Sequence, residues 1–202
     1  MMTRDSQDFP LRRRAVVEAL LRDRGDLLVV AGLGAPAWDV AAVGDSALDF
    51  PLWGAMGGAV MIGLGLALAQ PDRRVLVITG DGEMLMGIGS LATVAAMAAA
   101  SAPVNLAIVV LDNESYGETG MQPTHTARGA DLTAIAQAAG FPVTALARDE
   151  ETLASAVDLA RDARGPVFVA IKIRPESPPL VLPPRDGEIL KNRFRQALMG
   201  ED

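Results

Sequence analysis

Short apolar segments without polar alternation recur along this chain and alternate with longer segments of helical character. The predicted strands are residues 27–31, 74–79, 105–111, 142–146 and 167–172. The predicted helices are residues 10–24, 36–42, 53–69 (after a glycine-rich start), 87–101, 131–139, 150–163 and 186–198. Strands that alternate with helices form a parallel sheet covered on both faces, and strands buried in this way need no polar positions. The pattern therefore predicts an α/β domain.

The C-terminal part has a different composition. The segment Pro175–Pro184 contains five prolines, which favour an extended chain. We therefore divide the chain into a domain over residues 1–175 and a proline-rich arm with a C-terminal helix over residues 176–202.

Two predicted helices carry no charge at all. The 28 residues from Met84 to Leu111 are uncharged, and within the helix from Gly87 to Ala100 only Ser90 and Thr93 are polar. A helix that is apolar on every side is buried on every side, which one domain of this size seldom achieves. The helix at residues 57–69 is similar. We expect self-association into a dimer or higher oligomer, with a second subunit covering part of these helices.

The composition excludes several functions. The chain has 202 residues and no cysteine, which argues for a single domain without disulfides, iron–sulfur clusters or thiol catalysis. The net charge of −7 argues against nucleic acid as a partner, because phosphate backbones bind basic surfaces. The basic residues are interpreted as solvent-exposed charges: the triplet at 12–14 on the first helix, and Arg161, Arg164, Lys172 and Arg174 near strand ends.

No membrane association is expected. The uncharged runs at residues 50–71 and 84–111 are interrupted by Gly, Pro, Ser, Thr or Asn and are interpreted as buried strands and helices. The polar first residues are unlike a signal peptide. We expect a soluble, cytoplasmic protein.

Oxygen-bearing side chains follow two of the predicted strands. Gly80, Asp81 and Gly82 come directly after one strand, and Asp112 and Asn113 directly after the next. In open α/β sheets, ligands bind outside the carboxyl ends of the strands. Carboxylate and amide oxygens together with phosphate oxygens and water suit octahedral Mg²⁺. The spacing therefore predicts a metal–diphosphate site.

This arrangement resembles the diphosphate-binding, C-terminal domain of thiamine diphosphate enzymes, whose signature is Gly-Asp-Gly, a gap of about this length, and Asn. The resemblance implies a three-layer α/β/α fold with a six-stranded parallel sheet and thiamine diphosphate with Mg²⁺ as cofactors. It also implies metal ligands, which are Asp81, Asn113 and the backbone carbonyl of Ser115.

The resemblance further implies which residues bind the cofactor. Met56 matches the bulky residue that wedges between the two cofactor rings, and the Gly54 carbonyl matches the contact to the pyrimidine amino group. The backbone amides of Gly82 and Glu83 are expected to meet phosphate, with the Glu83 side chain pointing away. The remaining expected cofactor contacts are Gly32, Gly34, Gly80, Tyr116, Gly117, Glu118 and Thr119.

Within these enzymes, the chain is most similar to the β subunits or C-terminal halves of sulfopyruvate and phosphonopyruvate decarboxylases. Four stretches carry this likeness: residues 31–34, 53–58, 80–82 and 112–124. The implied activity is that of a lyase, the decarboxylation of a 2-oxo acid to an aldehyde. The family's activating glutamate belongs to a pyrimidine-binding domain that these 202 residues lack, so a separate α subunit is expected to supply it in a heteromer.

The proton donor and the reaction class stay open. His125, the only histidine, and Glu118 are the catalytic candidates for substrate contact or proton transfer, with Glu114 as a rival. One alternative is a subunit of another thiamine diphosphate enzyme, such as a carboligase or an oxoacid dehydrogenase. The other is a non-catalytic cofactor-binding subunit.

Overall fold

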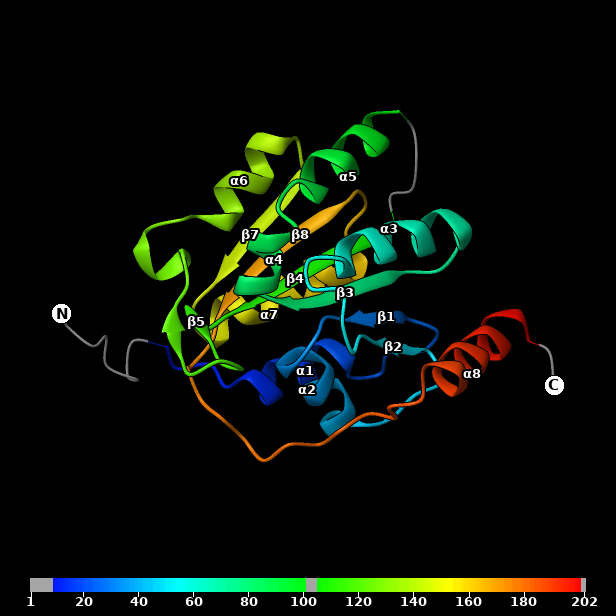
Figure 1. The fold of residues 1–202 in the computed structure, drawn as a ribbon. Helices are drawn as coiled ribbons and strands as arrows, with labels where there is room; N and C mark the ends of the chain where they lie inside the picture. Colours follow the sequence, from blue (N-terminus) through cyan, green and yellow to red (C-terminus); the bar gives the residue numbers. More distant parts are fainter. Residues whose placement is uncertain (1–8, 101–104, 201–202) are drawn as a thin grey trace.

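The central feature of the structure, a computed structural model that describes residues 9–100 and 105–200, is one parallel sheet of six strands. Its order is β2-β1-β3-β4-β8-β7 (Figure 1). The strand bounds are β1 Leu28–Ala31, β2 Asp49–Pro51, β3 Val75–Gly80, β4 Leu106–Asp112, β7 Val143–Ala147 and β8 Val167–Lys172. The predicted α/β fold with a six-stranded parallel sheet is confirmed.

Helices cover both faces of the sheet, which gives three layers (Figure 1). One face packs against α1 (Arg13–Leu21), α2 (Ala35–Val43) and α7 (Glu150–Asp162). The other packs against α3 (Ala59–Ala69), α4 (Asp81–Met86), α5 (Ser90–Ala99) and α6 (Leu132–Ala139). Successive strand residues alternate between the two cores: Val29 lies in the first, and Leu28 and Val30 in the second. This two-sided burial explains why the strands are uniformly apolar.

Three local features differ from the predicted elements. β2 spans only Asp49–Pro51 and lies in a segment to which no strand was assigned. The predicted helix at 87–101 is replaced by α4 and α5, which are separated at residues 87–89, and residue 101 lies outside the described residues. The loop before residue 130 contains a two-stranded hairpin, β5 (Ser115–Tyr116) with β6 (Gln122–Pro123), and a 3₁₀ helix, η1 (Thr126–Arg128).

The C-terminal segment runs back along the molecule to β2 (Figure 1). Residues 173–186 form neither helix nor strand, in agreement with the expected extended arm. They lead to α8 (Gly187–Met199), which packs beside β2. The rings of Phe50 and Phe194 lie 5.3 Å apart between centroids, and Arg193 pairs with Asp45 at 2.6 Å. The division at residue 175 stays a prediction. Among the described residues, no helix has the length and apolarity needed to cross a membrane.

The sheet order places a crevice between β1 and β3. These strands are neighbours, but the chain continues from β1 to β2 on one side and from β3 to β4 on the other. Loops leaving two such strands diverge, so a ligand can lie between them at the carboxyl edge of the sheet.

Candidate active site

The carboxyl ends of β1, β3 and β4 surround a pocket of about 200 Å³. It is lined by most of the predicted site residues, namely Met56, Gly80, Asp81, Gly82, Glu83, Asn113, Ser115, Tyr116, Gly117, Glu118 and Thr119. The fold therefore brings Asp81 and Asn113 into one pocket, as their positions directly after two strands predicted. The pocket is also lined by residues that were not among the predicted site residues: Arg13, Leu33, Ala35, Pro36, Met86, Leu111 and Ile173.

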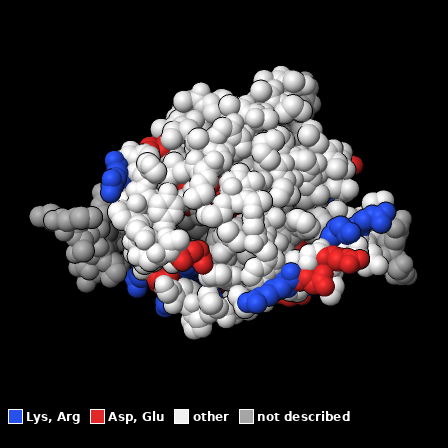
Figure 2. All heavy atoms as spheres, in the orientation of Figure 1, with Lys and Arg blue, Asp and Glu red and all other residues white. Residues whose placement is uncertain are grey.

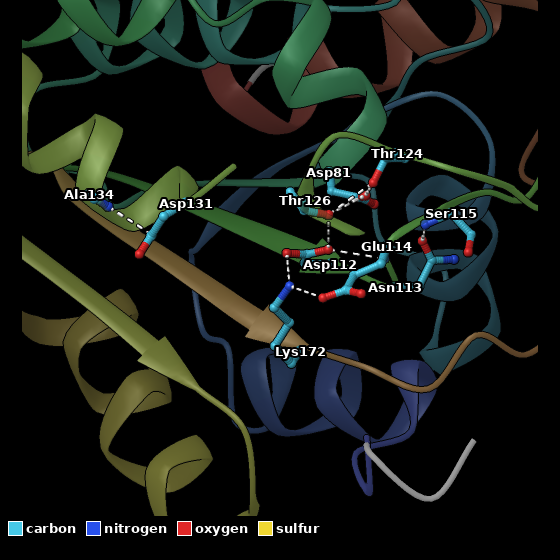
Figure 3. Close-up of polar contacts among 10 residues, drawn as sticks. All are labelled: Asp81, Asp112, Asn113, Glu114, Ser115, Thr124, Thr126, Asp131, Ala134 and Lys172. Atoms are coloured by element: carbon cyan, nitrogen blue, oxygen red, sulfur yellow. Dashed lines mark hydrogen bonds and ion pairs between the residues drawn. The ribbon is translucent and has the colours of Figure 1, made fainter. Parts of the chain in front are cut away.

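Asp81 is the first residue of α4 and is only 2% exposed. Its Oδ2 atom accepts a hydrogen bond from the Thr124 hydroxyl at 2.5 Å and lies 3.1 Å from the Thr126 hydroxyl (Figure 3). Burial, with the nearby charge of Asp112 as the second cause, raises the pKa of Asp81 to about 7. A cation beside this carboxylate would counter both effects, because it favours the charged form.

Asn113 and Ser115 follow β4 on a tight local turn. The Asn113 Oδ1 atom accepts a hydrogen bond from the Ser115 N–H at 3.0 Å. Between them, Glu114 has a φ of 58°, a conformation that is uncommon outside glycine. Ser115 then pairs with Pro123 in the β5–β6 hairpin. The turn points Asn113 and Ser115 into the pocket.

Glu83 lines the pocket, but its carboxyl reaches back between two strand ends. Its Oε2 atom accepts a hydrogen bond from the Thr79 hydroxyl at 2.7 Å. A Cβ at Gly32 would lie 1.8 Å from that oxygen, so a glycine at this position makes room for the acid. Burial raises the pKa of Glu83, opposed by Thr79 and by the backbone amides of Gly57, Leu33 and Ala59.

Gly32 and Gly34 thus take part in the pocket indirectly. Neither lines it, but a Cβ at Gly34 would lie 2.9 Å from Oε1 of Glu118. Burial raises the pKa of Glu118, and the Arg13 guanidinium and the Ala35 amide oppose this. Both glycines therefore accommodate acidic side chains that line the pocket.

Aromatic and sulfur-containing side chains complete the pocket. The Tyr116 ring lies against α4, since a Cβ at Gly82 would lie 2.5 Å from its Cε1 atom. Met56 lines the pocket and is 46% exposed, and it follows Ala55, whose φ is 58°. Gly54 is exposed and does not line the pocket.

His125 lies outside the pocket. It precedes η1, is exposed, and is not among the lining residues. Glu118 is the catalytic candidate that lines the pocket. Both assignments stay predictions.

Two interpretations of basic residues as solvent-exposed were wrong. Arg13 is buried and pairs with the buried Asp39, and Lys172 is only 7% exposed and pairs with two carboxylates. In each case the charge is buried because an acidic partner from another element meets it. The linear pattern carried no signal for these long-range pairs.

The donor atoms suit a hard cation. Asp81 and Asn113 present a carboxylate and an amide oxygen to the same pocket. Within residues 9–100 and 105–200, no three His, Cys, Asp or Glu side chains are grouped so that they could hold a metal. With Asp81 as a carboxylate ligand, a metal at this pocket would take its other ligands from amide, carbonyl, phosphate and water oxygens, a set that matches Mg²⁺.

Comparison with known proteins decides the family. Residues 34–171, more than half of the chain, match the family model "Thiamine pyrophosphate enzyme, C-terminal TPP binding domain". The chain belongs to this thiamine pyrophosphate enzyme family. The match contains the Gly-Asp-Gly turn and Asn113, so the residues that first suggested the family lie within the matching domain.

Curated and solved relatives agree. The chain is 41% identical to sulfopyruvate decarboxylase subunit beta of Methanothermobacter thermautotrophicus, over 91% of this chain and 95% of that one. It is 39% identical to phosphonopyruvate decarboxylase of Streptomyces viridochromogenes, over 82% of this chain and 40% of that one. A solved thiamin diphosphate-dependent enzyme from Mycobacterium smegmatis superposes with a TM-score of 0.67 at 26% identity, covering 82% of this chain and 32% of that chain.

Proposed function

We propose that this chain is the diphosphate-binding β subunit of a thiamine diphosphate-dependent 2-oxo acid decarboxylase. The observation that carries the proposal is the meeting of Asp81 and Asn113 with Met56 in one pocket at the β1–β3 crevice. The similarity to sulfopyruvate decarboxylase β subunits supports this reaction class. On the same grounds we propose an acid with a second anionic group, such as 3-sulfopyruvate or 3-phosphonopyruvate, as the substrate. The cytoplasmic location stays a prediction.

Different residues of the pocket would hold different parts of the cofactor. Asp81, Asn113 and the Ser115 carbonyl would hold Mg²⁺, which would neutralise part of the negative charge of the diphosphate. The first-turn amides of α4 at Gly82 and Glu83 have no partner within the helix and would meet phosphate oxygens. When bound, thiamine diphosphate supplies the nucleophilic carbon and the electron sink for loss of CO₂. Met56 would hold its two rings in a bent arrangement, and Tyr116 to Thr119 would border the diphosphate.

A proton must reach the carbon that loses CO₂. Glu118 lines the pocket, and its raised pKa favours a protonated carboxyl more than the ordinary pKa of a glutamate does. His125 would need the loop at residues 124–130, or a partner, to bring it to the substrate. We therefore rank Glu118 above His125 as the donor.

We further propose that a separate α subunit supplies the activating glutamate. The phosphonopyruvate decarboxylase relative matches this chain over only 40% of its own length, whereas the relative named subunit beta matches over 95%. The face over α3, α4 and α5 carries almost no charged side chains (Figure 2). It exposes Met56, Met61, Leu68 and Met86. An uncharged, partly apolar face of this kind is typical of a protein interface.

The proposal is tested by reconstitution. The chain alone should be nearly inactive on 3-sulfopyruvate or 3-phosphonopyruvate with cofactor and Mg²⁺, and active once the α subunit is added. An aldehyde product supports a decarboxylase, whereas an acyloin or an acyl transfer product indicates a carboligase or dehydrogenase. A fully active single chain would show that the activating carboxylate lies within these residues.

A second measurement tests the metal site directly. Asp81→Ala should abolish the stabilisation by cofactor plus Mg²⁺, which at a ligand concentration of 100 Kd amounts to about 2.7 kcal/mol for the wild type. Asp45→Ala is the control, because Asp45 is mostly exposed and pairs with Arg193 beside β2. Equal stabilisation of Asp81→Ala and wild type would refute the assignment, whereas equal stabilisation of Asp45→Ala and wild type is expected.

A further inference from the structure

A buried ion cluster lies beside the pocket, at the ends of β4 and β8 (Figure 3). Lys172 ends β8 and lies next to Asp112, which ends β4. The Lys172 Nζ atom is 2.7 Å from Asp112 Oδ2 and 2.7 Å from Glu114 Oε1. It also lies 5.8 Å from the centre of the Phe9 ring. All three charged side chains are buried, so the geometry of each depends on the others.

From this cluster, a series of short contacts between oxygen atoms leads to Asp81 (Figure 3). Asp112 Oδ1 accepts from the Thr126 hydroxyl at 2.8 Å and from the Glu114 N–H at 3.0 Å. The Thr126 oxygen lies 2.9 Å from the Thr124 hydroxyl and 3.1 Å from Asp81 Oδ2. Thr124 and Thr126 both contact the same oxygen of Asp81, Oδ2. The other carboxylate oxygen of Asp81, Oδ1, is contacted by neither hydroxyl.

The same lysine pairs with the residues on either side of Asn113. Side chains alternate along this turn: Asp112 and Glu114 border a polar cavity with Lys172, whereas Asn113 and Ser115 face the pocket. The Glu114 carbonyl in turn accepts a hydrogen bond from the Thr124 N–H at 3.0 Å. Holding residues 112 and 114 therefore sets the direction of Asn113 and the position of Thr124.

We propose that Lys172 is a positioning residue for the metal site, which acts through Asp112 and Thr126 on Asp81 and through Asp112 and Glu114 on Asn113. Without Lys172, two buried carboxylates lose their shared counter-charge and must separate or rehydrate. Both movements would displace the groups that orient the two ligands. Residues that orient metal ligands in this way typically contribute 10–100-fold, roughly, to metal affinity. The inference rests on the proposed metal role of Asp81 and Asn113.

The test is the affinity of the full 202-residue chain for Mg²⁺ at saturating thiamine diphosphate, measured by calorimetric titration. Lys172→Met should raise the Mg²⁺ dissociation constant by about 10-fold or more. Arg24→Met is the matched control, because it breaks another ion pair that is largely buried, Arg24 with Asp49 at 2.6 Å. Arg24 precedes β1 and Asp49 begins β2, so this pair lies at the edge of the sheet opposite to Asp81. Arg24→Met should lower the melting temperature of the unliganded chain but leave the Mg²⁺ affinity unchanged.

A second pair of variants covers the case in which Lys172→Met does not fold. Thr126→Val removes the hydroxyl between Asp112 and Asp81 and leaves the ion cluster intact, so this variant should also weaken Mg²⁺ binding. Thr126→Ser keeps the hydroxyl and should bind Mg²⁺ as the wild type does. Wild-type affinity in both Lys172→Met and Thr126→Val would overturn this inference alone. Absence of Mg²⁺ binding by the wild type would overturn the proposed metal site and this inference together. An equal loss of affinity in Arg24→Met would show that only stability is involved.

Discussion

Gly32→Ala should destabilise this protein because Glu83 occupies the space beside Gly32. The added Cβ would lie 1.8 Å from Glu83 Oε2, 2.8 Å from its Cδ and 3.0 Å from Thr79 Oγ1. Gly32 does not require a positive φ, so alanine fits the backbone and the effect is purely steric. Glu83 is 4% exposed, so its carboxyl can move away from the new methyl only into the pocket that it lines, and this movement breaks its hydrogen bond with Thr79.

The magnitude follows from this overlap. Overpacking of a filled interior costs about 1–3 kcal/mol, and displacing Glu83 also breaks its hydrogen bond with Thr79. For a domain of this size, each kcal/mol lowers the melting temperature by about 2–4 °C. The melting temperature should therefore fall by about 2–12 °C. Because Glu83 follows the proposed metal ligand Asp81 by two residues, Mg²⁺-dependent cofactor binding should weaken as well.

Thermal unfolding followed by circular dichroism is the assay. Gly65→Ala is the control, because no atom lies within 4 Å of its Cβ position and it is also free of positive φ; in the middle of α3 it should gain up to about 1 kcal/mol. The double variant Gly32→Ala with Glu83→Ala should be less destabilised than the sum of the two single variants, since the new methyl fills part of the space left by the acid. Wild-type stability of Gly32→Ala, or strict additivity in the double variant, would refute this reasoning.

Three further predictions follow from the pocket and its surroundings. Met56→Ala should lower kcat more than cofactor affinity, whereas Met56→Leu, of similar volume, should keep both; steady-state kinetics and cofactor titration separate these, and an unchanged kcat in the alanine variant would make Met56 ordinary packing. Glu118→Gln should lower kcat without reducing stabilisation by cofactor and Mg²⁺, and should do so more than His125→Ala; a larger effect of His125→Ala would reverse their ranking. Arg13→Met leaves the buried Asp39 with Arg14 alone and should cost about 3–5 kcal/mol in urea unfolding at pH 7. In the folded state, burial raises the pKa of Asp39 above 3.8, so the contribution of Asp39 to stability is most favourable below pH 3.8 and is lost as the pH rises through the folded pKa. Loss of Arg13 raises the folded pKa of Asp39 further. The loss of stability in Arg13→Met should therefore be smaller in acid than at neutral pH. A pH-independent cost would contradict this explanation.

The sequence by itself determined the class of fold and the place of the site. Uniformly apolar strands such as Leu106–Leu111 can be stable only in a sheet that is buried on both sides, and parallel strands bring their carboxyl ends to one edge. Asp81 and Asn113 follow strands directly, so their meeting required no knowledge of packing. The Gly-Asp-Gly turn and its spacing from Asn113 were sufficient to indicate the family.

Only the tertiary structure decided which charges are buried and what they orient. Lys172 and Arg13 resembled ordinary surface residues because their partners, Asp112 and Asp39, come from other elements. β2 was missed because a strand of three residues that begins with Asp49 has no pattern of its own, and it becomes a strand only by pairing with β1. Likewise, the space that Gly32 and Gly34 leave for Glu83 and Glu118 is visible only in the fold, and the predicted cofactor contacts of these two glycines stay predictions. Local patterns determine elements, because hydrogen bonding and burial repeat along the chain; contacts between distant side chains depend on the packing of the elements, which no local pattern contains.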